Sequence, residues 1–301
     1  MNNSHIQTER MTVHYRTHGD PNGLPMLLLH GSFASSRWWE PFFDILPDEI
    51  YAVAPDLRGC GLSSKDNYPE HIATPYAIEE QAEDLWAFIA AFNLAAKVDP
   101  MMGELHNFDL VGHSSGGAIA VEFALSHPEM PSTLILAAPV PLEGVFTPID
   151  GFMLLEQMRT DRALLRQALA TLMPSFIGTA QTELGEEPLP EQHFFEQIVD
   201  DATQMDPAAF TEVANALGQW NRFADARYLT LPCLVLWGDQ DPIVTREEMT
   251  RTLIAMPGAN NLEVLRGVGH SPMIEAPLTL AERIVDFITE DFSHLEQARN
   301  E

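Results

Sequence analysis

The chain has few cysteines, few lysines and no long hydrophobic run. It contains two cysteines and two lysines among 301 residues. Cys60 and Cys233 lie far apart and outside the spacings of metal or redox motifs, so two thiols in a reducing compartment are expected. The longest apolar runs, such as LILAAPVP, contain proline and are too short to span a membrane.

The N-terminal sequence and the charge narrow the class of protein further. MNNSHIQTER is polar and carries no secretory signal, which predicts a cytoplasmic location. Acidic residues number 44 against 16 Lys and Arg, a formal net charge of −28 at pH 7. A negative field of this size repels nucleic acid and anionic membranes, so neither is expected as a partner. The remaining expectation is an enzyme-sized protein that acts on a small-molecule substrate.

Short apolar runs recur along the chain and alternate with helical patterns. Most of them are continuous, as in strands buried on both faces of a parallel sheet; they cover residues 26–30, 51–55, 108–113, 133–139, 233–238 and 262–267. Intervening segments, such as 77–92, place apolar residues at helical spacing. Residues 4–23 predict an antiparallel hairpin that leads into the first buried strand. The pattern predicts an α/β fold with a doubly wound, mostly parallel sheet that binds ligands at the carboxyl ends of its strands.

The alternation stops between residues 142 and 227. This segment shows amphipathic helical patterns without a clear strand, and prolines separate them: Pro174, Pro188, Pro190 and Pro207. A helical block between two buried strands is typical of a lid. We therefore predict an inserted helical cap at 142–227 and a core formed by residues 1–141 and 228–301.

The stretch DLVGHSSGGAIA contains the motif G-x-S-x-G between an apolar strand and a helix. A sharp turn at this place strains its central residue, Ser114, and requires small neighbours such as Gly112 and Gly116. The following helix directs its N-terminal amides and partial positive charge toward an anion beside the serine. Ser114 is the predicted nucleophile, and at Ser115 the backbone N–H matters rather than the hydroxyl.

A serine nucleophile needs a base that takes its proton and a carboxylate that orients the base. Among eleven histidines, His270 follows a strand and lies in a glycine-rich loop that ends before a helix. This position predicts that His270 lies at the same edge of the sheet as Ser114. Asp239 and Asp241 both follow the strand at 233–238. Asp241, at the far end of its loop, is preferred as the acid. Asp239 and Glu143 are the alternatives.

The segment LLLHGSFASSRWW predicts the second donor of an oxyanion hole after another strand. The backbone N–H of Ser32 is the first candidate and that of Phe33 the second. His30 is expected to brace this loop through its ring nitrogens. Candidate walls of the substrate pocket are His113, Trp38 and Trp39, although a core role for one of the tryptophans is equally compatible with the sequence.

Together these motifs resemble the α/β-hydrolase fold family, in its lidded esterase-like branch. The matching stretches, in family order, are LLLHGSFASSRWW, APDLRGCGLSS, LVGHSSGG, LVLWGDQDPI and GVGHSPMIEAP. The resemblance implies that Ser114, Asp241 and His270 are nucleophile, acid and base, and that Ser32 and Ser115 are oxyanion donors. It implies a structural turn at residues 56–61 that includes Asp56, Arg58, Gly59 and Gly61. It implies no cofactor and no metal.

The function expected on these grounds is hydrolysis of a small or medium apolar carboxylic ester or lactone through an acyl-enzyme. Hydrolysis of a carbon–carbon bond in a diketone and perhydrolysis use the same triad and stay open. A receptor with little turnover on the same fold is an alternative of another class. Dehalogenases and epoxide hydrolases of this fold use an aspartate nucleophile, so a serine at position 114 argues against both.

One connection is longer than is usual for this family. Residues 93–107 enter the nucleophile strand at its N-terminal end, opposite the predicted chemistry. We therefore expect a surface elaboration here and regard it as a candidate contact between the subunits of a homodimer.

Overall fold

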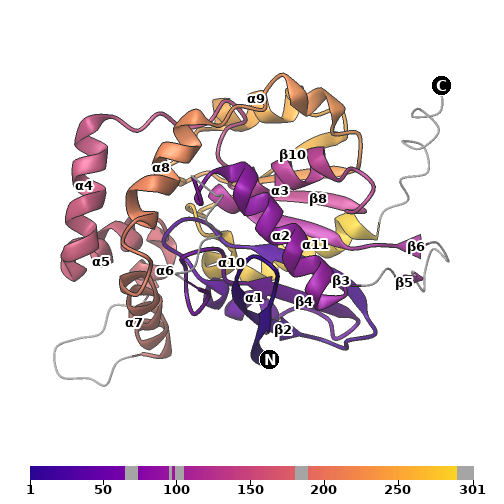
Figure 1. Ribbon diagram of the computed structural model, residues 1–301, viewed down its shortest axis with the longest axis horizontal. Coiled ribbons are helices and arrows are strands. Elements are labelled where there is room, and N and C mark those ends of the chain that lie inside the picture. Colours follow the sequence, from indigo (N-terminus) through magenta and orange to yellow (C-terminus); the bar gives the residue numbers. More distant parts are fainter. Residues whose placement is uncertain (65–73, 95–96, 99–104, 180–188, 290–301) are drawn as a thin grey trace.

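A computed structural model describes residues 1–64, 74–94, 97–98, 105–179 and 189–289 (Figure 1). Its main sheet has eight strands in the order β1-β2-β4-β3-β7-β8-β9-β10. The β1–β2 and β2–β4 pairs are antiparallel, and all other neighbours are parallel. The strands are β1 (Asn2–Gln7), β2 (Thr12–His18), β3 (Leu24–Leu29), β4 (Ile50–Pro55), β7 (Asp109–His113), β8 (Thr133–Ala137), β9 (Cys233–Gly238) and β10 (Ala259–Leu265).

The central strands are buried because helices cover both faces of the sheet. Every residue of β7, β8 and β9 is buried, which explains why these strands read as continuous apolar runs. The predicted doubly wound sheet and the N-terminal hairpin are confirmed. The bounds differ by a few residues, since β3 begins at Leu24 and β10 at Ala259. Cys60 and Cys233 are buried thiols.

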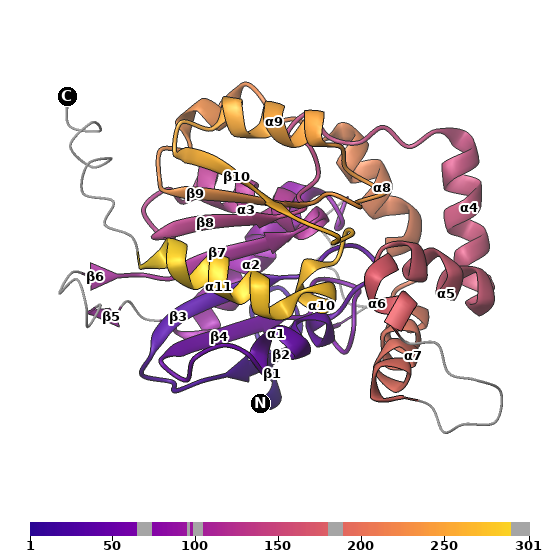
Figure 2. The ribbon, with the colours of Figure 1, turned by 180° about the vertical axis from the view of Figure 1, so that it is seen from behind.

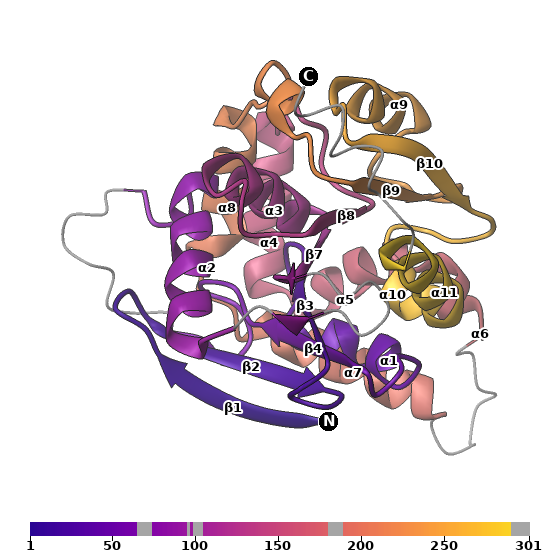
Figure 3. The same cartoon turned by 90° about the vertical axis from the view of Figure 1, so that its right-hand side faces the viewer.

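Two pairs of helices form the outer layers. Seen along the sheet, α2 (Ile78–Phe92) and α3 (Ser115–Ser126) lie on one face, and α1 (Glu40–Phe43) and α11 (Pro277–Ile288) lie on the other (Figure 3). Glutamates in the first turn of α2 stabilise the helix through its dipole, and Asn93 ends the helix in the left-handed conformation. Other helices of the core are α9 (Arg246–Ala255), α10 (Pro272–Glu275) and the short 3-10 helix η1 (Ser36–Trp39). A second 3-10 helix, η2 (Asp225–Tyr228), lies where residues 142–227 rejoin the core.

A run of helices separates β8 from β9 and gathers at one end of the sheet (Figure 2). It consists of α4 (Ile149–Thr160), α5 (Arg162–Thr171), α6 (Pro174–Thr179), α7 (Pro190–Thr203) and α8 (Ala209–Gln219). Asp161 begins α5 by accepting hydrogen bonds from the backbone of Ala163 and Leu164. We call residues 142–227 the helical segment; that it forms a separate cap domain stays a prediction.

Hydrogen bonds join the helical segment to the core. The Oδ2 atom of Asp201, on α7, accepts from Ser35 Oγ at 2.7 Å and from Arg37 Nε at 2.8 Å. The Tyr76 hydroxyl donates to Asp206 Oδ2 at 2.7 Å. Both anchors connect the segment to loops that follow core strands, so the segment is docked on that edge of the sheet.

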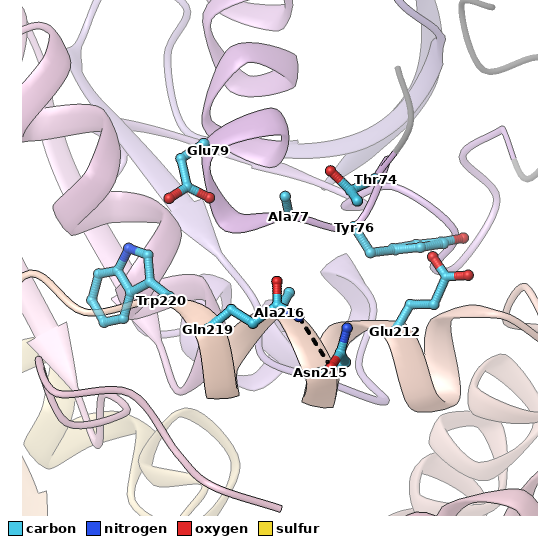
Figure 4. Close-up of a pocket in the computed structure, with 9 residues that line it drawn as sticks. All are labelled: Thr74, Tyr76, Ala77, Glu79, Glu212, Asn215, Ala216, Gln219 and Trp220. Atoms are coloured by element: carbon cyan, nitrogen blue, oxygen red, sulfur yellow. Dashed lines mark hydrogen bonds between the residues drawn. The ribbon is translucent and has the colours of Figure 1, made fainter. Parts of the chain in front are cut away.

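A polar pocket of about 500 Å³ lies where the start of α2 faces α8 (Figure 4). Glu79 reaches it from α2 and Glu212 from α8, and Arg222 pairs with Glu79 at 2.7 Å. The full lining is Thr74, Tyr76, Ala77, Glu79, Glu212, Asn215, Ala216, Gln219 and Trp220. This pocket is formed by residues other than the predicted catalytic ones.

The long connection before β7 contains a small second sheet. Its strands are β5 (Lys97–Val98) and β6 (Leu105–His106), and they pair antiparallel. Both views place them at the end of the molecule opposite α4 to α7 (Figures 1 and 2). Other parts of the connection, 95–96 and 99–104, lie outside the described residues, and the predicted subunit contact stays a prediction.

Candidate active site

The turn between β7 and α3 holds Ser114 in a strained backbone conformation. Its φ of 52° and ψ of −121° lie outside the regions that side chains with a Cβ atom normally adopt. A Cβ added to Gly112 would lie 2.6 Å from the carbonyl oxygen of Gly116, and one added to Gly116 would lie 2.4 Å from that of His30. The glycines therefore let the helix approach the sheet, and the turn presents the serine at the end of β7.

His270 lies between Ser114 and Asp241. Its Nε2 atom is 3.0 Å from Ser114 Oγ, and its Nδ1 atom is 2.8 Å from Asp241 Oδ2. A carboxylate only accepts hydrogen bonds, so Nδ1 carries a proton and Nε2 is left to accept from the serine hydroxyl. The imidazole is 3% exposed, which shields these contacts from water.

The carboxylate that contacts His270 is Asp241. Its Oδ1 atom accepts from the backbone N–H groups of Ile243 and Val244 at 2.7 and 3.1 Å, which leaves Oδ2 directed at the imidazole. The alternative, Asp239, accepts from the Gly267 N–H at 2.7 Å.

The two alternative acids therefore have structural partners. The backbone hydrogen bond from Gly267 lowers the pKa of the Asp239 carboxyl below its usual value. Glu143 pairs with Arg251 at 2.8 Å. Neither carboxylate is bonded to His270, so both are set aside as partners of the base.

His113 holds the backbone of the histidine loop. Its Nε2–H donates to the carbonyl of His270 at 2.8 Å, while its buried Nδ1 atom has no hydrogen-bond partner among the described residues. Burial, together with the nearby His270, lowers the pKa of His113 well below its usual value, so the ring stays neutral. The sequence suggests a pocket wall at this position, whereas the structure directs the ring at protein backbone.

The tryptophans predicted to wall the pocket lie in the interior. Trp38 is 1% exposed and Trp39 is 0% exposed. The Trp38 ring lies 6.0 Å from that of His113, and Trp39 packs edge-on against Phe42 at 5.6 Å. The sequence leaves a core role open for one of them, and the structure places both in the core because η1 turns them toward the sheet.

Ser32, Phe33 and Ser115 surround the serine turn. The Ser32 hydroxyl donates to Ser115 Oγ at 3.0 Å, so the loop after β3 lies beside the start of α3. The first amides of a helix have no partner within the helix and are free to bind an oxyanion. Phe33 has a φ of 61° and packs its ring 5.4 Å from that of Phe210, in α8. The roles of these residues as oxyanion donors stay predictions.

His30 braces the loop that carries Ser32. Its Nδ1–H donates to the Gly31 carbonyl at 2.8 Å, and its Nε2 atom accepts from the Leu57 N–H at 2.9 Å. Burial lowers the pKa of His30, which favours the neutral ring. The neutral tautomer with its proton on Nδ1 satisfies both hydrogen bonds. The ring therefore braces the loop after β3, as the sequence predicts, and it also connects this loop to the turn after β4.

The turn after β4 is structural. Burial alone would raise the pKa of the Asp56 carboxyl, but hydrogen bonds from His14 and Ser36 hold it well below its usual value. The distances are 2.7 Å from His14 Nδ1 and 2.6 Å from the Ser36 N–H. Arg58 pairs with Asp84. The charged groups of Asp56 and Arg58 are therefore bonded to structural partners and not to Ser114.

The loops after β7, β9 and β10 bring together a serine hydroxyl, an imidazole and a carboxylate, and their roles as nucleophile, base and orienting acid stay predictions. Such a group activates a hydroxyl at neutral pH for attack on an electrophilic carbon. The three side chains belong to loops at the same edge of the sheet, which is the edge where ligands bind in open α/β sheets. The arrangement requires no metal ion for this chemistry.

Residues 26–283 match the model of the Alpha/beta hydrolase family, so the chain belongs to this family. It is 26% identical to the uncharacterized protein Rv2715 of Mycobacterium tuberculosis, over 88% of this chain and 76% of that protein. It is 24% identical to the monoacylglycerol lipase abhd6-B of Xenopus laevis, over 91% of this chain and 78% of the lipase.

Solved structures share the fold at low sequence identity. An esterase from Exiguobacterium antarcticum has a TM-score of 0.74 at 24% identity and is covered completely by 96% of this chain. The enol-lactonase of Burkholderia xenovorans has a TM-score of 0.75 at 18% identity, with 95% of this chain and 100% of the lactonase covered. Bromoperoxidase from Bacillus anthracis has a TM-score of 0.78 at 19% identity, over 96% of this chain and 100% of that protein.

None of the helices in the described ranges combines the length and the apolar composition that a membrane span requires. The predicted cytoplasmic location and the predicted partners stay predictions.

Proposed function

We propose that the protein is a serine hydrolase that cleaves a small or medium apolar carboxylic ester or lactone through an acyl-enzyme on Ser114. The observation that carries the proposal is the continuous hydrogen-bonded path from Ser114 through His270 to Asp241. The membership in the Alpha/beta hydrolase family supports it. The relatives and neighbours named as lipase, esterase and lactonase support an ester or lactone as substrate.

The first half of the reaction forms the acyl-enzyme. Ser114 Oγ attacks the carbonyl carbon while its proton passes to Nε2 of His270, and the carbonyl electrons move to the oxygen. Asp241 stabilises the imidazolium through Nδ1. The backbone amides of Ser32 and Ser115 are the proposed donors to the oxyanion. Collapse of the intermediate breaks the bond to the leaving alcohol, which takes the proton from His270.

The second half releases the acid. Water gives a proton to His270 and attacks the acyl carbon, and the resulting intermediate collapses as the serine oxygen leaves and recovers its proton. The base returns to its neutral form after each turnover. No electron acceptor or further reactant is needed, so water and the ester are the only substrates.

An apolar substrate fits the side chains around the predicted oxyanion loop. The Phe33 ring follows Ser32 and packs against Phe210 of the helical segment. Aromatic side chains at this place favour an apolar group over a charged one, because burying a charge without a partner is costly. We therefore propose a chain or ring of modest size on one side of the ester.

The proposal is tested with a panel of substrates and two matched serine variants. The panel contains p-nitrophenyl esters of graded chain length, acyl-homoserine lactones and a vinylogous diketone, with peracid formation measured alongside. We expect ester or lactone turnover that falls about 10³-fold or more in Ser114→Ala. Ser126→Ala, at the exposed end of α3, is the control.

Three outcomes would contradict the proposal. Full ester turnover in Ser114→Ala removes the serine from the mechanism. Turnover of the diketone or formation of peracid without ester cleavage favours the other reactions of the same triad. Thermal stabilisation by a panel compound with negligible release of product favours a receptor.

A further inference from the structure

The loop that carries His270 is bonded to the helical segment through its backbone. The His270 N–H donates to the Leu172 carbonyl at 2.9 Å, and the Ser271 hydroxyl donates to the same oxygen at 3.2 Å. Pro174 packs so tightly here that a Cβ added to Gly269 would lie 2.5 Å from its Cδ atom. The segment between α5 and α6 therefore contacts the backbone of the predicted base and the residue on either side of it.

Glu275 joins the two sides of this contact with one carboxylate. Its Oε1 atom accepts from the Ser271 N–H at 3.1 Å. Its Oε2 atom accepts from the Ser175 N–H at 3.2 Å and from the Ser175 hydroxyl at 2.6 Å. Ser271 follows the base in the core, whereas Ser175 lies in α6, 100 residues before Glu275. One side chain thus holds the histidine loop and the helical segment together.

The surroundings give this carboxylate a fixed geometry. Glu275 ends the short helix α10, where the N–H groups of Ile274 and Glu275 both donate to the Ser271 carbonyl at 2.9 Å. Ser271 is 0% exposed, so its N–H would lose a partner without Glu275. A buried N–H without an acceptor destabilises its local conformation, and a hydrogen bond to a charged acceptor is stronger than a neutral one.

Besides its contact with Ser114, the base is then held at three points, one on its ring and two on its backbone. Asp241 holds the ring, His113 holds the carbonyl and Leu172 accepts from the N–H. The first two anchors belong to the core, whereas Leu172 belongs to the helical segment. Glu275 lies beside the third anchor, because it bonds to the residue after the base and to the residue after Pro174.

We propose that Glu275 is a positioning residue that couples the docking of the helical segment to the alignment of His270 with Ser114. The inference rests on the proposed function insofar as His270 is the base. Glu275 touches neither the serine nor the acid, so it acts only through the loop. Loss of its carboxylate leaves the triad residues present but releases the N–H anchor of the base.

The test uses Glu275→Ala, Glu275→Gln, Ser175→Ala and the double variant Glu275→Ala/Ser175→Ala, with activity measured per titrated active site. We expect kcat for a p-nitrophenyl ester to fall about 10- to 100-fold in Glu275→Ala, as misplacement of a catalytic group by about 1 Å suffices for this. KM should change by less than about threefold, since the effect is on alignment. Glu282→Gln, on the exposed side of α11, is the control for loss of a carboxylate.

The variants differ in the half of the contact that they remove. Glu275→Gln keeps one oxygen acceptor and places an amide N–H₂ against the other donor, so its kcat should lie between those of Glu275→Ala and the unmodified chain. Ser175→Ala removes only the hydroxyl contact and should lower kcat by about fivefold, which corresponds to about 1 kcal/mol for such a bond. The double variant should be no worse than Glu275→Ala alone, because both substitutions break the same link.

The pH profile separates positioning from a purely structural role. A base that turns away from Asp241 loses stabilisation of its imidazolium, so the acidic limb of kcat/KM should move to lower pH in Glu275→Ala. A purely structural role would lower the number of active sites found by active-site titration and leave the pH profile of the remaining active enzyme unchanged. If Glu275→Ala does not fold, the same measurements on Ser175→Ala decide.

The inference and the proposed function fail in different ways. Unchanged kcat per site and an unchanged pH profile in Glu275→Ala and Ser175→Ala overturn the inference, provided that Ser114→Ala is inactive. An active Ser114→Ala overturns the proposed function instead. Additive effects of the two substitutions in the double variant also overturn the inference, since they would show two independent contacts.

Discussion

The Nε2 atom of His270 lies 3.0 Å from Oγ of Ser114, although 156 positions separate the two residues in the chain. The contact depends on strands β7 and β10, which end at the same edge of the sheet with β8 and β9 between them. It also depends on the strained backbone of Ser114, whose side chain makes no capping hydrogen bond to α3. Predictions about activity therefore follow from groups that hold either residue in place.

The first prediction concerns the acid. Asp241→Asn keeps an oxygen that accepts from Ile243 and Val244 but places an amide group against Nδ1 of His270. The imidazole would then adopt the tautomer that cannot accept the serine proton, and kcat should fall about 10⁴-fold.

Asp239→Asn is the matched control, because Asp239 follows the same strand and accepts from Gly267 instead. Its kcat should stay within about tenfold of the unmodified chain. Steady-state kinetics on the two variants test the assignment. Equal losses, or a larger loss in Asp239→Asn, would contradict the account.

The predicted sheet and the serine turn followed from local sequence patterns. Continuous apolar runs marked β7, β8 and β9 because both faces of these strands are covered. Small residues on either side of Ser114 marked the turn, since close packing of helix on strand leaves no room for a Cβ atom at Gly112 or Gly116.

The choice between acids and the docking of the helical segment could not be derived in the same way. Asp239 and Asp241 both follow β9, and only the backbone path decides which one reaches His270. The contact of Glu275 with Ser175 joins residues 100 positions apart, and no local pattern marks such a pair. The motif predicts Trp38 near the site, but its burial depends on how η1 packs on the sheet.

A second prediction concerns pH and stability. Burial and the neighbouring His270 lower the pKa of His113 well below its usual value, so the folded chain keeps this ring neutral while the unfolded chain protonates it near pH 6.5. Its contribution to stability is complete above about pH 6.5 and is lost as the pH falls below that value.

His113→Gln keeps an N–H donor at the end of the side chain but cannot bind a proton. Between pH 7.5 and 5.5 the free energy of unfolding should therefore fall by about 1 kcal/mol less in this variant than in the unmodified chain. Urea unfolding at both pH values measures the difference, with His193→Gln on the exposed side of α7 as the control. The same pH dependence in both proteins would refute a buried, neutral His113.

A third prediction compares two helical glycines. Gly116→Ala puts a Cβ atom 2.4 Å from the carbonyl oxygen of His30, so the loop after β3 must move. We expect a loss of about 1–3 kcal/mol in the free energy of unfolding, together with a lower kcat.

Helix propensity alone predicts the opposite sign, because Ala favours a helix by about 1 kcal/mol over Gly. Gly218→Ala, in α8, is the matched control, since its Cβ atom would meet its nearest neighbour, Val145 O, at 3.4 Å, which is ordinary contact. That variant should be as stable as the unmodified chain or more so in thermal unfolding. A stabilised and fully active Gly116→Ala would show that the turn is not closely packed.

Mass spectrometry of the protein treated with a fluorophosphonate shows whether Ser114 is the residue that becomes acylated. We expect one adduct per chain, located on the peptide that contains Ser114 and absent in Ser114→Ala, with loss of ester turnover in proportion to labelling. Continued ester turnover in a fully labelled protein, or an adduct on another residue that alone tracks the loss of activity, would contradict this expectation.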